Sequence, residues 1–142
     1  MPASPTPKMS KADFERLAHF RYQLRRFLRF SEEVSREHGI TSLQYLLMLQ
    51  IKGFPGREWA TVGELAERLQ AQQHGVVSLI SRCEATGLVK RRGSSDDKRR
   101  VEVSLTKKGE RCLAQLAHLH RVELTSLQGA FAVPDLGALH PE

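Results

Sequence analysis

Residues 61–106 read TVGELAERLQAQQHGVVSLISRCEATGLVKRRGSSDDKRRVEVSLT, and this stretch decides the fold of the chain. Its signals follow one another in a fixed order: a capped short helix, a second helix after a tight turn, and two β-patterned runs joined by a polar, basic loop. That order is typical of a helix-turn-helix motif followed by a β-hairpin, or wing.

The first helix of the motif has a capping box at its start. Thr61 is followed three residues later by Glu64, so each side chain can bind an otherwise unpaired backbone N–H of the other. The pattern predicts a helix that begins at Val62. Its apolar face recurs at helical spacing and consists of Val62, Leu65, Ala66 and Leu69.

The second helix, expected from Gln72 to Thr86, has an inner apolar stripe at positions i, i+3, i+4 and i+7. The stripe consists of Val76, Leu79, Ile80 and Cys83. Burying it turns the opposite face outward, where Gln73 matches an adenine edge and Val77 a thymine methyl group in a DNA major groove. The side chains expected to meet DNA from this helix are Gln72, Gln73, His74, Val77, Ser78 and Arg82.

Gly75 is unusual inside a helix, where glycine costs about 1 kcal/mol relative to alanine. Two explanations stay open at this point. The missing side chain either lets the backbone lie close to a partner surface or serves packing within the protein.

A hairpin with a basic tip follows. Gly87 is suited to close the second helix in the left-handed conformation, residues 88–92 form a short strand, and residues 100–105 alternate between inward and outward side chains. Positions 90–100 hold six basic residues and two acidic ones, which gives this hairpin a net charge of +4. A hairpin with that charge could bind along a phosphate backbone. A solvated surface hairpin is the alternative. The basic residues are Lys90, Arg91, Arg92, Lys98, Arg99 and Arg100.

These residues resemble the MarR family of winged-helix transcriptional regulators. The matching pieces are GELAERL at 63–69, GLV at 87–89 and DKR at 97–99, which leads into VEVSLTKKG at 101–109. The resemblance covers about residues 40–112 by motif and the whole chain by element order, and it implies that Asp97 braces the wing through an arginine while Arg99 enters the minor groove. The chain departs from the family where a serine usually caps the recognition helix, because Gln72 is a weaker cap.

Composition narrows the class of protein. The chain has 142 residues, a net charge of +6 and two cysteines far apart in sequence, with no signal peptide and no long apolar run. These features predict one domain, or a domain with a dimerising appendage, in a soluble, reduced, cytoplasmic protein with no membrane partner. No nucleophile elbow, phosphate loop or helical histidine pair at metal-ligand spacing occurs, so we expect neither an enzyme nor a metal or cofactor site.

The chain is predicted to begin with a disordered tail at 1–9 and a long dimerisation helix at 10–40. Ser10 followed by Asp13 indicates where that helix starts. That helix has a wide apolar face and is too long for so small a domain to cover alone, which indicates a second subunit. Arg21, Arg25 and Arg29 form a stripe with Arg26 beside it. The stripe is either a solvated face or a site that captures an anionic ligand or DNA phosphates.

Residues 41–105 are expected to form the winged helix-turn-helix domain. Thr41 and Gln44 form a second capping box for a helix at 42–51, whose Leu43, Leu46, Leu47 and Leu49 should be largely buried. Residues 59–61 are short enough for a third, edge strand of the wing sheet, with Trp59 as a packing residue.

Residues 106–142 are expected to form the C-terminal dimerisation helices, with Thr106 as the cap. The predicted fold is therefore mainly α with a small β-hairpin wing and long dimerisation helices at both ends. A two-helix seam between paired subunits would bury a near-heptad stripe. The stripe consists of Leu113, Leu116, His120, Leu124, Leu127 and Phe131.

The sequence predicts a homodimeric, sequence-specific DNA-binding regulator, and more specifically a repressor. Its two-fold symmetry predicts a double-stranded operator with an inverted repeat, whose half-sites lie about one helical turn apart. The resemblance implies release by a small aromatic or anionic effector between the dimer helices and the DNA-binding lobe. The residues proposed for it are His19, Tyr22, Arg25 and Tyr45. Two alternatives remain: a winged helix that binds an acidic protein, and a regulator switched by oxidation of Cys83 or Cys112.

Overall fold

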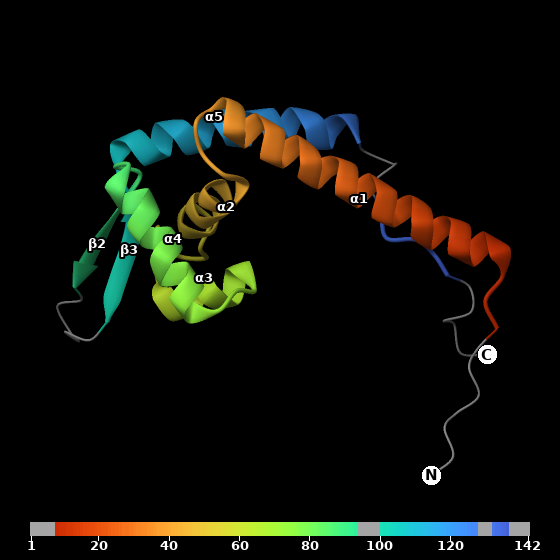
Figure 1. The fold of residues 1–142 in the computed structure, drawn as a ribbon, viewed down its shortest axis with the longest axis horizontal. Helices are drawn as coiled ribbons and strands as arrows, with labels where there is room; N and C mark the ends of the chain where they lie inside the picture. Colours follow the sequence, from red (N-terminus) through yellow and green to blue (C-terminus); the bar gives the residue numbers. More distant parts are fainter. Residues whose placement is uncertain (1–7, 94–99, 128–131, 137–142) are drawn as a thin grey trace, which may run out of the picture.

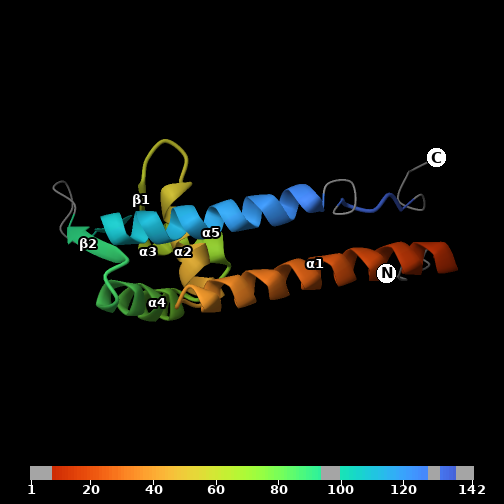
Figure 2. The same cartoon turned by 90° about the horizontal axis from the view of Figure 1, so that it is seen from above.

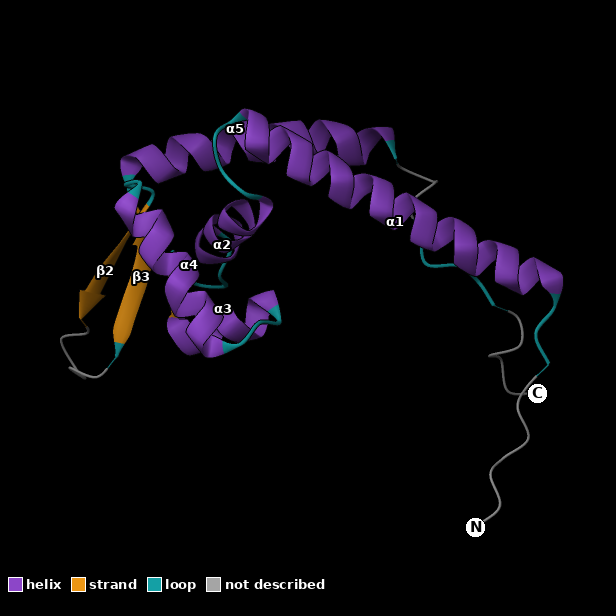
Figure 3. Ribbon diagram, viewed as in Figure 1, coloured by secondary structure: helices purple, strands orange, loops and turns teal. Residues whose placement is uncertain are grey.

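A computed structural model describes residues 8–93, 100–127 and 132–136. Within these ranges the chain is mainly helical with one small antiparallel sheet, which confirms the predicted fold class (Figures 1 and 3). The elements are α1 (Lys11–Glu37), α2 (Ser42–Lys52), β1 (Trp59–Thr61), α3 (Val62–Leu69), α4 (Gln73–Ala85), β2 (Val89–Gly93), β3 (Val101–Leu105) and α5 (Lys107–Ser126). The sheet, α2, α3 and α4 form a lobe at one end, from which α1 and α5 extend alongside each other (Figures 1 and 2).

The helix starts are those that the sequence predicts. Capping boxes form at Ser10 with Asp13, Thr41 with Gln44, and Thr61 with Glu64. The Thr106 hydroxyl accepts a hydrogen bond from Gly109 N at 3.0 Å and caps α5. Gln72 precedes α4 without any side-chain cap, as expected of a glutamine there. Local side-chain to backbone hydrogen bonds therefore set where these helices begin.

The core of the lobe lies between α2, α3, α4 and the sheet. The inner stripe of α4 is buried as predicted, with Ile80 and Cys83 fully covered. Leu47 of α2 is also fully buried, but Leu43 is 52% exposed, so its predicted burial is wrong. Leu43 lies in the first turn of α2; helical spacing gives the direction of a side chain, not how far the neighbouring elements extend along the helix.

The sheet has the strand order β1-β3-β2, with both pairs antiparallel. The prediction that residues 59–61 add an edge strand is confirmed, since Trp59 pairs with Ser104 and Thr61 with Glu102. Alternation along β3 buries Val103 and Leu105 against the helices. Gly87 adopts a φ of 77° and turns the chain from α4 into β2, as the sequence predicts.

The stripe of α5 is buried differently from the prediction. Leu113, Leu116 and His120 are at most 5% exposed within a single chain, so their burial needs no second subunit. The cover comes from α1 and α2, which both contact α5. Leu124 further along is 42% exposed, and Phe131 lies outside the described residues.

Candidate nucleic-acid interface

The outer face of α4 is exposed along the length of the helix. Because the inner stripe fixes the rotation of α4, the residues between its members must point away from the core. Val77 is 40% exposed on this face. The other exposed residues of the face are Gln73, His74, Gly75, Ser78, Ser81 and Arg82, with Gln72 just before the helix. These side chains are polar or short, so a flat partner can approach the helix closely.

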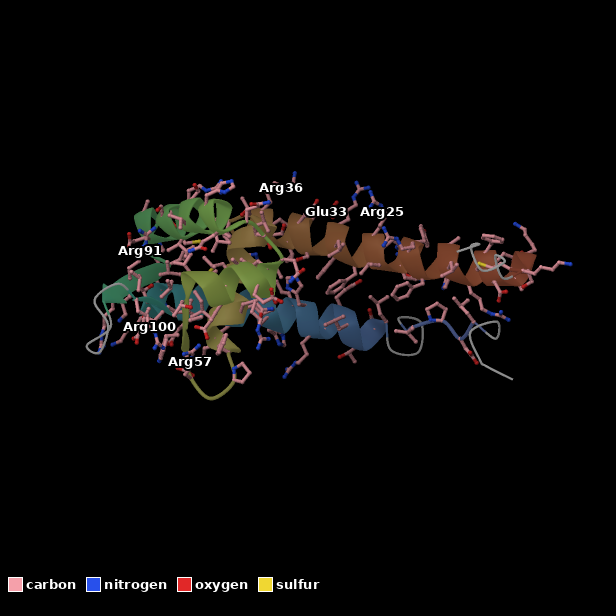
Figure 4. The ribbon with its side chains drawn as sticks, turned by 90° about the horizontal axis from the view of Figure 1, so that it is seen from below. Arg25, Glu33, Arg36, Arg57, Arg91 and Arg100 are labelled. Carbon is pink, nitrogen blue, oxygen red and sulfur yellow. The ribbon has the colours of Figure 1, made fainter. Side chains whose placement is uncertain are left out.

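Arg91 of β2 joins the wing to this face. Its Nη2 donates hydrogen bonds to the Ser81 hydroxyl and, at 3.4 Å, to the Val77 carbonyl oxygen. Its backbone N–H donates to Glu84 Oε2 at 3.3 Å. The wing base is thus fixed against α4, and the Arg91 guanidinium lies on the same surface as the outer residues of the helix (Figure 4).

The basic residues of the wing that the structure describes are exposed. Cross-strand pairing places Lys90 opposite Ser104 and Arg92 opposite Glu102. Arg100, the residue before β3, extends over the ring of Trp59 with Cζ 4.9 Å from the ring centroid. Asp97, Lys98 and Arg99 lie outside the described residues, so their expected contacts stay predictions.

A cluster of guanidinium and aromatic groups surrounds Trp59, and the sequence did not point to it. Arg57 Cζ lies 3.8 Å from the Trp59 centroid and 4.3 Å from that of Phe54. Arg57 also forms an ion pair with Glu64. Trp59 is therefore a packing residue as predicted, but it packs on charged planes and is only half-buried.

Glu64 both caps α3 and binds Arg57 in this cluster. Its carboxylate accepts a hydrogen bond from Thr61 N at 2.9 Å and pairs with Arg57. Burial raises the pKa of Glu64, but the hydrogen bonds from Thr61 and Arg57 outweigh it, and the pKa lies below its usual value. Arg57 thus has a charged partner that is anchored in the first turn of α3.

The structure separates the four residues proposed for an effector. Tyr22 and Arg25 line one groove along α1 together with Arg26, whose Cζ lies 5.7 Å from the Tyr22 ring centroid. His19 lines a second hollow beside residues 132–134. Tyr45 is only 4% exposed, so an effector could reach it only if the interior opened. Of the arginine stripe on α1, Arg29 is paired with Glu33 at 2.9 Å.

His120 occupies the junction of α1, α2 and α5. Its ring stacks on Tyr45 with centroids 4.3 Å apart, and Nδ1 lies 2.7 Å from the Leu116 carbonyl oxygen. A carbonyl only accepts, so Nδ1 carries a proton, and in the neutral ring Nε2 accepts from the Ser31 hydroxyl at 2.8 Å. Both nitrogens are therefore used by the packing of the three helices.

The two cysteines have surroundings that disfavour the reactive thiolate. Burial raises the pKa of Cys83 to about 11, and burial also raises the pKa of Cys112. A thiol reacts with peroxide mainly as the thiolate, so neither position favours a redox switch. Among the described residues, no three histidine, cysteine or acidic side chains come together as a metal site, and no helix is long and apolar enough to cross a membrane.

Comparison with known proteins agrees with this geometry. The sequence profile of the MarR family matches residues 38–100. AbsC, a MarR family transcriptional regulator from Streptomyces coelicolor, has a similar structure with a TM-score of 0.73 and 19% identity, covering 91% of this chain and 86% of that one. A MarR family protein from Bacillus stearothermophilus gives 0.70 and 23%, covering 88% and 86%.

A structure of mutant MarR from E. coli, complexed with operator DNA, is also similar. Its TM-score is 0.67 at 25% identity, over 87% of this chain and 85% of that chain. The search of curated proteins gives no match.

Proposed function

We propose that this chain is a MarR-family winged helix-turn-helix regulator and acts as a homodimeric, sequence-specific DNA-binding transcriptional repressor. The match of the family profile to residues 38–100 and the similar fold of the solved structures support this proposal. One observation carries the proposal: the face of α4 opposite the core is exposed and continues into a basic hairpin. A helix of this width fits a major groove, and a cationic hairpin beside it fits the phosphates of the adjacent minor groove.

In the proposed complex α4 reads base edges and the wing contacts the backbone. Gln73 has the donor and acceptor for an adenine edge, Val77 meets a thymine methyl group, and Ser78 binds a base or a phosphate. Arg99 is proposed to enter the minor groove. The E. coli relative, whose structure holds operator DNA, supports this mode for the shared fold.

The dimer is proposed from apolar surface that one chain leaves uncovered. Phe14 of α1 is 55% exposed and Val122 of α5 is 55% exposed, on the two helices that extend from the lobe. A second copy would bury these side chains, and its two-fold axis would place the recognition helices on an inverted repeat.

The proposed effector has a candidate site in a groove along α1. The groove beside Tyr22 and Arg25 offers an aromatic ring and a guanidinium to an aromatic or anionic molecule. Tyr45 would join such a site only if α1 or α5 moved, because its ring is stacked on His120.

Salt dependence of DNA binding tests the proposed function. Affinity for duplex fragments retained from the source genome should fall by about a thousandfold or more between 50 and 200 mM salt if six or more phosphates are contacted.

Arg99→Ala should weaken binding to all sequences and lower the salt slope by about one, whereas Gln73→Ala should relax the choice of one base. Fluorescence anisotropy measures both. If the parent protein does not bind duplex DNA but binds an acidic protein, the alternative function, a winged helix that binds proteins, would replace the proposed one.

Gly75 gives a second test, because its open surroundings remove one of its two explanations. A Cβ added at Gly75 would meet no atom within 4 Å, so packing within the chain does not require glycine. We expect Gly75→Ala to raise the free energy of unfolding by about 0.5–1 kcal/mol. The same methyl group should weaken operator binding by about tenfold, by blocking close approach of α4 to DNA. An affinity equal to that of the parent would contradict this role.

A further inference from the structure

We propose that Trp59 is a positioning residue of the wing: its ring holds the Arg100 guanidinium in the orientation in which it meets the DNA backbone. The inference rests on the proposed DNA-binding function. It assigns a task in recognition to an edge strand that lies outside the helix-turn-helix and outside the hairpin.

The register of the sheet brings the two side chains together. Trp59 lies opposite Ser104, and side chains alternate along β3, so Trp59, Ser104 and Glu102 share the face of the sheet that is turned away from the core. Arg100, two residues before Glu102, belongs to the same face. Its side chain extends along the strand until Cζ is 4.9 Å from the Trp59 centroid.

The Trp59 ring is itself held in place. Arg57 lies 3.8 Å from its centroid and is paired with Glu64, whose carboxylate is fixed by the capping box of α3. Phe54 supports the same guanidinium at 4.3 Å. The ring is therefore attached to α3 and presents a fixed aromatic face to Arg100.

This arrangement contributes little to the core. The neighbouring Ala60 is fully buried on the inner face, whereas Trp59 is half-buried on the outer face. Among the described residues no carboxylate forms an ion pair with Arg100. Figure 4 shows Arg100 and Arg57 together on one side of the lobe, with Arg91 on the other.

Stacking has a physical consequence for binding. An arginine on an aromatic face is attracted by the ring and has fewer rotamers to lose when it contacts DNA. Lysine keeps the charge but not the planar group, so it cannot stack in the same way. Trp59 and Arg100 should therefore act on affinity as one unit.

A double-mutant cycle on the full-length protein tests this. Operator affinity and its salt slope are measured for the parent, Trp59→Leu, Trp59→Phe, Arg100→Ala and the double variant Trp59→Leu/Arg100→Ala. We expect Trp59→Leu to weaken binding by about five- to tenfold and to lower the salt slope as Arg100→Ala does, with Trp59→Phe close to the parent. The double variant should bind no more weakly than Arg100→Ala alone.

If Trp59→Leu does not fold, operator binding by the Arg100→Lys variant provides a second test of the proposal. It leaves Trp59 and the net charge intact, and it should still lose several-fold in affinity. Additive effects of Trp59→Leu and Arg100→Ala, or an Arg100→Lys variant that binds like the parent, would overturn the proposal and leave the DNA-binding function standing. A parent protein that binds no duplex DNA would overturn the proposed function as well.

Discussion

Gly109→Ala should lower the free energy of unfolding by about 3 kcal/mol or more, the largest effect expected of a methyl group added at any glycine that the structure describes. A Cβ at this position would overlap the carbonyl oxygen of Leu88 and lie 3.0 Å from its carbonyl carbon. That carbonyl cannot easily retreat, because it accepts a hydrogen bond from Thr106 N at 3.1 Å where α5 begins. The glycine of the LTKKG segment is thus required by the contact between α5 and the start of β2.

Urea denaturation followed by circular dichroism measures this loss. Gly75→Ala is the matched control, since it adds the same methyl group to a helix where nothing lies within 4 Å. The two substitutions should change stability in opposite directions. If Gly109→Ala unfolds at the same urea concentration as the parent, the close contact with Leu88 is not a feature of the protein in solution.

Placing glutamate at both Val122 and Leu124 should make the protein monomeric and weaken operator binding by about a hundredfold. These side chains are 55% and 42% exposed on α5, so charging them disturbs no core of the single chain. Pairing of two such variant chains would, however, bury two unpaired carboxylates of each chain in the proposed subunit interface. A monomer engages one half-site at a time and loses the gain of a linked second contact.

Sedimentation equilibrium and anisotropy with the same operator check this expectation. Thr125→Glu is the control: it adds one carboxylate, where the double variant adds two, at an exposed position of the same helical turn that already carries a polar side chain. It should stay dimeric and bind DNA like the parent. A parent that sediments as a monomer, or a doubly charged variant that stays dimeric, would remove the proposed role of α5 in pairing.

Features of the fold that depend on near neighbours in sequence were predicted well. The capping residues Ser10, Thr41, Thr61 and Thr106 all begin helices, and the inner stripe of α4 is buried. A cap needs only atoms three residues apart, and helical spacing fixes which side chains share a face. The edge strand at 59–61 was also found, because its length and position left few other structures open.

The candidate site was predicted less completely. The exposed face of α4 followed from burying the opposite side, and the structure places Gln73 and Ser78 on it. The contact of Arg91 with Ser81 did not follow from any pattern, since ten residues and a turn separate them. Residues 94–99 at the hairpin tip lie outside the described ranges, so their part in binding rests on the sequence.

By itself, the sequence determined the order of the helices, the caps at which most of them begin, the inner and outer faces of α4, and the likeness to winged-helix regulators. Each of these depends on hydrogen bonds or spacing within a few residues. Only the tertiary structure decided that His120 and Leu116 are covered by their own chain, that Trp59 meets Arg57 and Arg100, and that Gly109 must have no side chain. Those outcomes depend on which faces meet when the elements pack, and residue spacing along one element carries no information about its partner.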